Sequence, residues 1–118
     1  IQGQLGKASE ATDIERTLID ITVRPAYAGG VKQVLQCYIT ARSIISPKKL
    51  IMTLEKMKYL YPYHQAVGFY MQNAGFDPAS WSELREKELR YDFFLAHGIT
   101  NRAYDPEWRI FFPKGLGV

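Results

Sequence analysis

The stretch SPKKLIMTLEKMKYLYPYHQAVGFYMQNAG, residues 46–75, predicts two successive helices and thereby a mainly helical fold. Ser46 is a favourable N-cap residue, and Pro47 fits the first position of a helix. Pro62 restarts the chain, and Gly75 is placed to end the second helix in a left-handed conformation. Apolar residues recur every three or four positions in both halves, which is the spacing of a buried helical face.

Two more helices are predicted before this stretch. The first follows a capping-box pattern, Thr12-Asp13-Ile14-Glu15, and should end near Arg24-Pro25. Gly29 and Gly30 allow positive φ angles, and the next helix is expected to start from them. This helix places Cys37 beside its apolar face, where we expect a buried thiol.

The pattern changes after residue 75. A short polar helix is predicted behind a second capping-box pattern, Ser80-Trp81-Ser82-Glu83. Aromatic residues then alternate with other residues from Tyr91 to Leu95 and again from Trp108 to Phe112, which is typical of strands. We therefore predict a mainly α fold of about five helices with a small C-terminal β-hairpin, an α+β arrangement.

Length and composition indicate one globular domain. The chain has 118 residues, of which 47% are hydrophobic and 14% aromatic. It starts with Ile1 and not Met, so we expect a piece of a longer protein, with residues 1–10 as a lead-in or linker. There is no signal-peptide pattern and no run of roughly 18 apolar residues that could span a membrane. A single cysteine fits a reducing compartment, and we expect a soluble, cytoplasmic protein without a membrane partner.

No catalytic, cofactor-binding or metal-binding residues are identified. His64 and His97 are the only histidines, and neither has a second histidine or cysteine at metal-ligand spacing. Cys37 has no basic neighbour one helical turn away that would activate its thiol. Nucleophile-elbow, Walker and dinucleotide-binding motifs do not occur. We therefore expect a domain that is not an enzyme and acts by binding, without a cofactor.

The most informative polar feature is the basic segment 48–58, in which four lysines are opposed by a single glutamate. The chain has a formal net charge of +3, which is compatible with an acidic protein partner or with nucleic acid. We expect these lysines to be exposed and to contribute little to folding. Our candidate partner-binding residues are Arg24, Lys48, Lys49, Lys56 and Lys58.

The helix pair 47–60 and 62–74 also has the outline of a helix-turn-helix. Its second helix contains no Arg or Lys, however, and a recognition helix without basic residues is unusual. A tight helix pair is also the ordinary way of building a small bundle. Three interpretations of the lysines stay open, which are a solvated face, a protein-docking surface and a contact to the phosphate backbone.

Three segments resemble the C-terminal domain of AbiEi-type antitoxins. They are ATDIERTLID (11–20) with the following Arg24-Pro25 and Ala28-Gly29-Gly30, VGFYMQNAGF (67–76), and WRIFFP (108–113). The resemblance covers about Ala11 to Pro113, nearly the whole chain. Its motifs are helix caps and packing glycines, which indicate a fold more than a site.

This resemblance implies a function in bacterial type IV toxin–antitoxin or abortive-infection systems. Such antitoxins join an N-terminal winged helix, which binds operator DNA and represses its own operon, to a C-terminal domain that counters a nucleotidyltransferase toxin. Residues 11–118 would be the C-terminal domain, with the winged helix absent, and the cognate toxin would be the partner. Operator DNA would bind through the missing part and weakly at best through this domain. The segment Tyr63-His64-Gln65-Ala66 departs from the family's pattern, which has basic residues before the glycine, and this argues against a charged contact from that helix.

We therefore predict a non-enzymatic antitoxin effector domain of a transcriptional regulator. The alternative is a nucleic-acid-binding transcriptional regulator module that uses the Lys48–Lys58 helix. A third hypothesis is an enzyme fragment whose active residues lie elsewhere.

Overall fold

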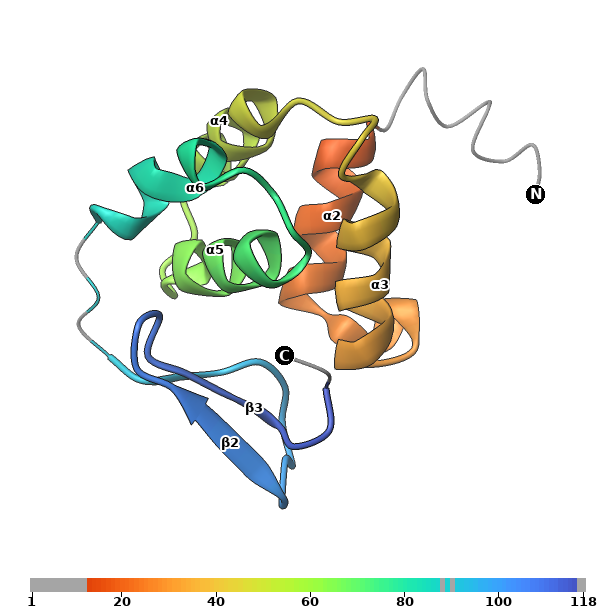
Figure 1. Ribbon diagram of the computed structural model, residues 1–118, viewed down its shortest axis with the longest axis vertical. Coiled ribbons are helices and arrows are strands. Elements are labelled where there is room, and N and C mark those ends of the chain that lie inside the picture. The colour runs from red at the N-terminus through yellow and green to blue at the C-terminus, as the bar shows by residue number, and fades with distance from the viewer. Residues whose placement is uncertain (1–12, 88, 90, 117–118) are drawn as a thin grey trace.

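The computed structural model describes residues 13–87, 89 and 91–116, and its described part contains five α-helices, a short 3-10 helix and a small sheet (Figure 1). The predicted mainly helical fold with a small C-terminal β part is confirmed. The predicted lead-in, residues 1–10, lies outside the described residues. The elements are α2 (Ile14–Val23), η1 (Pro25–Ala28), α3 (Val31–Ala41), α4 (Pro47–Met57), α5 (Tyr63–Asn73), α6 (Pro78–Arg85), β1 (Phe93–Phe94), β2 (Arg102–Asp105) and β3 (Ile110–Pro113).

Short polar side chains start three of the helices. Asp13 caps α2 by accepting a hydrogen bond from the backbone N–H of Arg16, at 2.7 Å, and Ser46 caps α4 as predicted. The predicted cap of α2, Thr12, lies outside the described residues. The predicted start of α6 was wrong by nearly one turn, because Asp77 and not Ser80 is its cap. Pro78 then occupies the first helical position, where its missing N–H costs nothing.

Helix α5 is the centre of the molecule. Its residues Gln65 to Met71 are all buried, and it contacts α2, α3, α6 and β3. Figure 1 shows α5 between the other helices and the sheet. A helix that is covered on all sides is expected to be apolar around its whole circumference, which explains why this segment contains no Arg or Lys. Its C-terminal end follows the prediction, since Gly75 has a φ of 89° just behind the last turn.

The paired glycines before α3 also behave as predicted. Gly29 has a φ of 101° and Gly30 a φ of 126°, both in the region that favours glycine. Gly29 ends η1, and Gly30 is the N-cap position of α3. The turn of the chain from α2 into α3 therefore depends on this pair.

The β part differs in detail from the predicted hairpin. It has three strands in the order β1-β3-β2, with β2 antiparallel and β1 parallel to β3. The hairpin partner of β3 is thus β2, which the sequence analysis missed, and the predicted partner at 91–95 contributes only the short parallel strand β1. Trp108 was predicted in a strand but precedes β3, in a turn where Arg109 has a positive φ of 56°.

Packing and hydrogen bonds of Trp108 and Gln65 hold the sheet against α5. The Trp108 side chain is fully buried, and its indole N–H donates to the side-chain oxygen of Gln72. A Cβ atom on Gly68 would overlap the six-membered ring of Trp108, so only glycine permits this contact. The amide of Gln65 donates to the backbone oxygens of Trp108, at 2.7 Å, and Tyr91, at 3.0 Å. These contacts explain how two short, otherwise marginal strand pairs hold a fixed place.

None of the helices in the described part of the chain is long and apolar enough to cross a bilayer.

Candidate functional surfaces

Helix α4 turns its lysines outward because its apolar residues take the opposite side. Leu50, Ile51 and Leu54 are buried in the core, and they lie on one face of the helix at helical spacing. The other side carries Lys48, Lys49, Met52 and Lys56, which are all exposed. Together with Asp13, Ser46 and Thr53, they line a shallow depression of about 400 Å³.

Lys49 is not a free surface lysine. Its ammonium lies 3.4 Å from a carboxylate oxygen of Asp13 and 3.8 Å from one of Glu15, both on the N-terminal end of α2. The pKa of Asp13 is lowered, first by the hydrogen bond from the Arg16 backbone N–H and then by Lys49. Glu15 is buried and accepts a hydrogen bond from the backbone N–H of Ser46 at 3.0 Å. Lys49 therefore joins α2 to α4 through two ion pairs, with its own side chain 53% exposed. The expectation that it contributes little to folding stays a prediction.

Lys48 and Lys56 differ from Lys49 in their surroundings. Within the described residues neither forms an ion pair, and Glu55, the glutamate of the same segment, pairs instead with Lys87 of the chain beyond α6 at 3.3 Å. Met52 lies between the two lysines in the helix, and its side chain is 49% exposed. We call the residues Lys48, Met52 and Lys56 the lysine face.

Lys58 lies outside the lysine face. It follows the last turn of α4 in a left-handed conformation with a φ of 50°, and its backbone N–H donates to the oxygen of Glu55. Tyr59 then packs against the core, and the following Leu60 and Tyr61 are 99% and 69% exposed. Lys58 thus sits on an exposed connection that enters α5 and not on the α4 helix surface.

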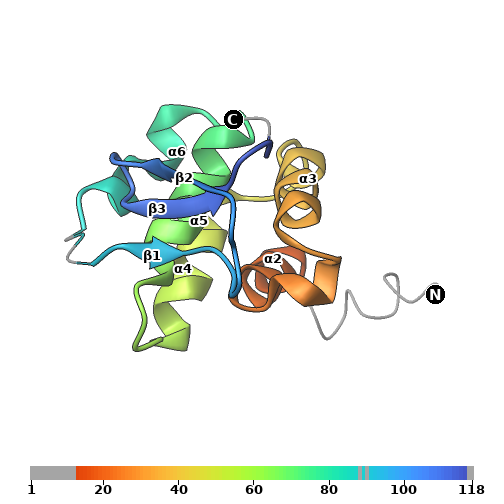
Figure 2. The ribbon, with the colours of Figure 1, turned by 90° about the horizontal axis from the view of Figure 1, so that it is seen from below.

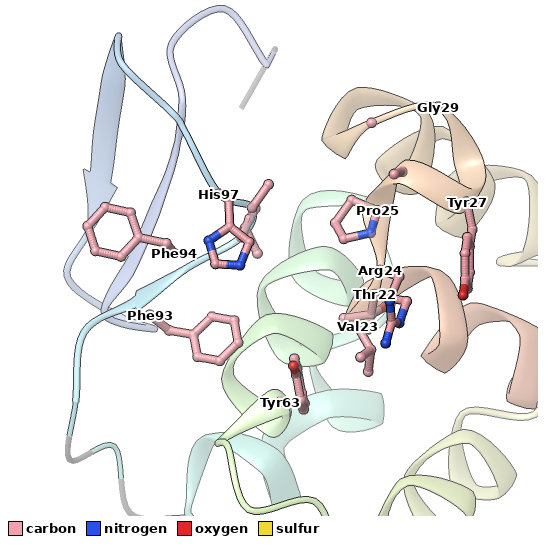
Figure 3. Close-up of a pocket in the computed structure, with 14 residues that line it drawn as sticks. Thr22, Val23, Arg24, Pro25, Tyr27, Gly29, Tyr63, Phe93, Phe94 and His97 are labelled. Carbon is pink, nitrogen blue, oxygen red and sulfur yellow. The ribbon is translucent and has the colours of Figure 1, made fainter.

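Arg24 lines a different and larger groove of about 850 Å³ between η1 and β1 (Figure 3). Its guanidinium lies 5.9 Å from the centre of the Tyr27 ring, and Tyr63, Phe93 and His97 line the same groove. Burial raises the pKa of Tyr63, and the positive charge of Arg24 opposes this shift. Since Arg24 and the lysines line separate depressions, the five predicted partner-binding residues do not form one site.

The helix-turn-helix interpretation of α4 and α5 conflicts with the burial of α5. A recognition helix must expose one side to enter the major groove. The buried run Gln65 to Met71 fills the middle of α5, beneath β3 and α6. In this fold α5 therefore cannot read base edges, and a contact to nucleic acid through this helix pair would be limited to the lysines of α4.

The residues considered as metal-binding or catalytic candidates lie apart from one another in the described part of the structure. Among the described residues, no three or more His, Cys, Asp or Glu side chains gather as a metal site would require. His97 lies in a turn beside Gly98, as expected, and His64 is half-buried at the start of α5. Cys37 is exposed, which corrects the predicted buried thiol. Its position lies about 100° from the middle of the buried face of α3, so it belongs to the outer edge of that helix.

The outer face of the sheet carries three aromatic residues that the sequence did not bring together as one group, with Phe94 and Tyr104 exposed and Phe111 half-buried between them. Phe94, Phe111 and Tyr104 stand side by side on β1, β3 and β2, because they are paired in register. We call these three residues the aromatic row. The sequence holds one indication of this row, because Arg102 and Tyr104 are two positions apart and so share one side of a strand. Four residues with a single aromatic are too few to predict that strand, however.

No family model, no curated protein and no solved structure matches this chain. The resemblance to AbiEi-type antitoxins consequently stays a prediction made from the three segments quoted above.

Proposed function

We propose that this chain is a non-enzymatic regulatory domain that binds a protein partner and counters a nucleotidyltransferase toxin, as the resemblance to AbiEi-type antitoxins implies. The observation that carries the proposal is the lysine face. Two exposed lysines, which form no ion pair with any described residue, flank an exposed methionine in a shallow depression. Such a surface suits an acidic partner, because unpaired charges guide the encounter and a flexible thioether adapts to the opposing surface.

Two of the resembling segments pack against each other in this structure. Residues 67–76 belong mainly to α5, and residues 108–113 contain β3. They meet where Gly68 faces the ring of Trp108, a contact that demands glycine on one side and a large ring on the other. A shared fold would preserve this pair of features even where surfaces differ. The proposal includes a cytoplasmic location, which suits the one cysteine of the sequence.

Growth rescue tests the proposal in cells. A nucleotidyltransferase encoded beside this protein, where the resemblance implies the toxin, is expressed together with the protein or its variants. The double variant Lys48→Glu/Lys56→Glu should lose rescue, because it turns an attractive surface into a repulsive one. The control Lys32→Glu/Lys114→Glu changes the net charge equally at exposed positions away from α4 and should keep rescue. Full protection by the Lys48/Lys56 variant at equal protein level would refute the lysine face as the contact.

A measurement of operator repression distinguishes the proposed protein-binding function from the nucleic-acid-binding alternative. The winged helix that the resemblance implies would carry repression, so the Lys48/Lys56 variant should still repress. Loss of repression together with intact rescue would favour the alternative, in which the lysines of α4 contact phosphates.

A further inference from the structure

The outer face of the sheet carries three aromatic rings in a row across all of its strands. The rings of Phe94 and Phe111 are stacked with centroids 4.6 Å apart, and Tyr104 lies 4.8 Å from Phe111 on the other side. Phe94 is 45% exposed and Tyr104 is 41% exposed. The opposite side of β3 uses Ile110 and Phe112 to contact the core, so the aromatic row contributes little to it.

No helix of the described chain covers this face. Figure 2 shows β1, β3 and β2 in front of α5 and α6, with the outer side of the sheet toward the viewer. Figure 3 shows that Phe93 and Phe94 point to opposite sides of β1, Phe93 toward Tyr63 and Phe94 away from it. The row is thus a separate surface from the groove that Arg24 lines.

The charges around the row are positive. The guanidinium of Arg102 lies 5.3 Å from the Phe94 ring centre and 5.6 Å from that of Phe111, and within the described residues it forms no ion pair. Lys114 lies at the same end of the β2–β3 hairpin, where its backbone N–H donates to Asn101. The carboxylate of Asp92 is compensated, since Arg109 donates to it at 3.1 Å and the Tyr104 hydroxyl at 2.7 Å.

We propose that the aromatic row and Arg102 bind single-stranded nucleic acid, with unpaired bases stacking on Phe94 and Tyr104, the two outer rings of the row. Sheet faces that bind single-stranded RNA carry two or three exposed aromatic rings on neighbouring strands, and every base has a face that can stack on such a ring. Arg102 supplies the cation for the phosphate that connects two stacked bases. A duplex keeps its bases inside the stack and cannot use the row.

This inference goes beyond the proposed function and rests on other residues. Neither Lys48 nor Lys56 belongs to the sheet, so toxin rescue and strand binding can fail independently of each other.

Fluorescence anisotropy with a labelled 12-nucleotide oligouridylate tests the inference at low salt. The 118-residue chain should bind, and an unlabelled duplex of equal length should compete poorly. Phe94→Ala/Tyr104→Ala should weaken binding about 10-fold or more, because stacking on each ring is lost. The control Tyr27→Ala/Tyr61→Ala removes two aromatic residues elsewhere that are more exposed, at 70% and 69%, and should leave affinity unchanged. Circular dichroism shows whether each variant keeps its fold.

A second variant distinguishes stacking from charge attraction. Tyr104→Trp should retain binding, and oligouridylate should quench the added indole fluorescence relative to the wild-type background. Three results would overturn the inference: no binding by the wild-type chain, equal competition by the duplex, or equal loss in both double variants. A change of the Phe94/Tyr104 variant in sedimentation with unchanged oligouridylate affinity would also overturn it and would assign the face to contacts between copies of the chain.

Discussion

At the residue scale, Tyr38 and Tyr70 form the most constrained pair in the core. Their rings are stacked with centroids 5.0 Å apart, and both side chains are fully buried. The Tyr38 hydroxyl shares a hydrogen bond of 2.7 Å with Thr22, whose own hydroxyl donates to Leu18. The Tyr70 hydroxyl has no partner among the described residues. Two chemically identical groups therefore contribute differently to stability.

Replacing each tyrosine by phenylalanine should reveal this difference. Tyr70→Phe is expected to leave the free energy of unfolding unchanged or to raise it by up to about 2 kcal/mol, because it removes a buried hydroxyl that lacks a partner. Tyr38→Phe is expected to lower it by about 1 kcal/mol, because a satisfied hydrogen bond is lost. Urea unfolding of both variants measures the two values. Equal destabilisation would mean that the Tyr70 hydroxyl is also satisfied.

Gly68 tests the contact that holds the sheet on α5. Gly68→Ala should destabilise the protein by about 2 kcal/mol or more, since the added methyl group forces the buried Trp108 ring out of place. Gly98→Ala is the matched control, because it lies in open space with a φ of 73° and should cost only about 1 kcal/mol of backbone strain. Thermal unfolding compares them. A Gly68→Ala protein as stable as the control would contradict the packing described here.

At the element scale, α2 and α4 are joined through the carboxylates of Asp13 and Glu15. Lys49→Glu should destabilise the protein by about 1–2 kcal/mol, because it places a third carboxylate beside these two. Lys56→Glu, on the same helix but without an ion-pair partner among the described residues, should cost less than about 0.5 kcal/mol. Both values come from urea unfolding at neutral pH.

The pH dependence of this difference follows from the lowered pKa of Asp13. The stabilisation that Asp13 gains from its partners is present above its ordinary value of 3.8 and is lost as the pH falls through the lower folded-state pKa. The penalty of Lys49→Glu should therefore shrink as the carboxylate of Asp13 becomes protonated. A penalty that is constant down to about pH 2.5 would show that the repulsion between carboxylates is not its cause.

Elements with a strong local signal could be predicted from the sequence, and those defined by distant contacts could not. Arg24-Pro25 explains the end of α2, and Gly75 explains the end of α5. The pair Gly29 and Gly30 explains the start of α3. Each of these residues determines the backbone conformation at its own position. The strand β2 depends on pairing with β3, and its four residues show no alternation of apolar and polar side chains. The bond of Lys49 to α2 likewise joins segments that only folding brings together, so all four lysines looked alike in the sequence.

At the scale of the whole molecule, the buried tyrosines should limit stability in alkaline solution. Burial raises the pKa of Tyr38 and of Tyr70 well above the ordinary value of 10.0. The unfolded chain therefore loses these protons first, and stability should fall as the pH rises above about 10, by up to about 1.4 kcal/mol per pH unit for each tyrosine. Urea unfolding between about pH 9 and pH 11 should show a shallower fall for Tyr70→Phe. Identical slopes for wild type and variant would contradict the assignment.

We propose that this domain acts by binding a protein partner, a nucleotidyltransferase toxin, through the lysine face. The most direct measurement is titration calorimetry of the purified chain with the purified nucleotidyltransferase toxin at low and at physiological salt. We predict a complex that weakens with salt and that Lys48→Glu/Lys56→Glu weakens by about 10-fold or more, whereas Lys32→Glu/Lys114→Glu binds like wild type. Equal affinity of both double variants, or a wild-type chain that does not bind the toxin at all, would contradict the claim.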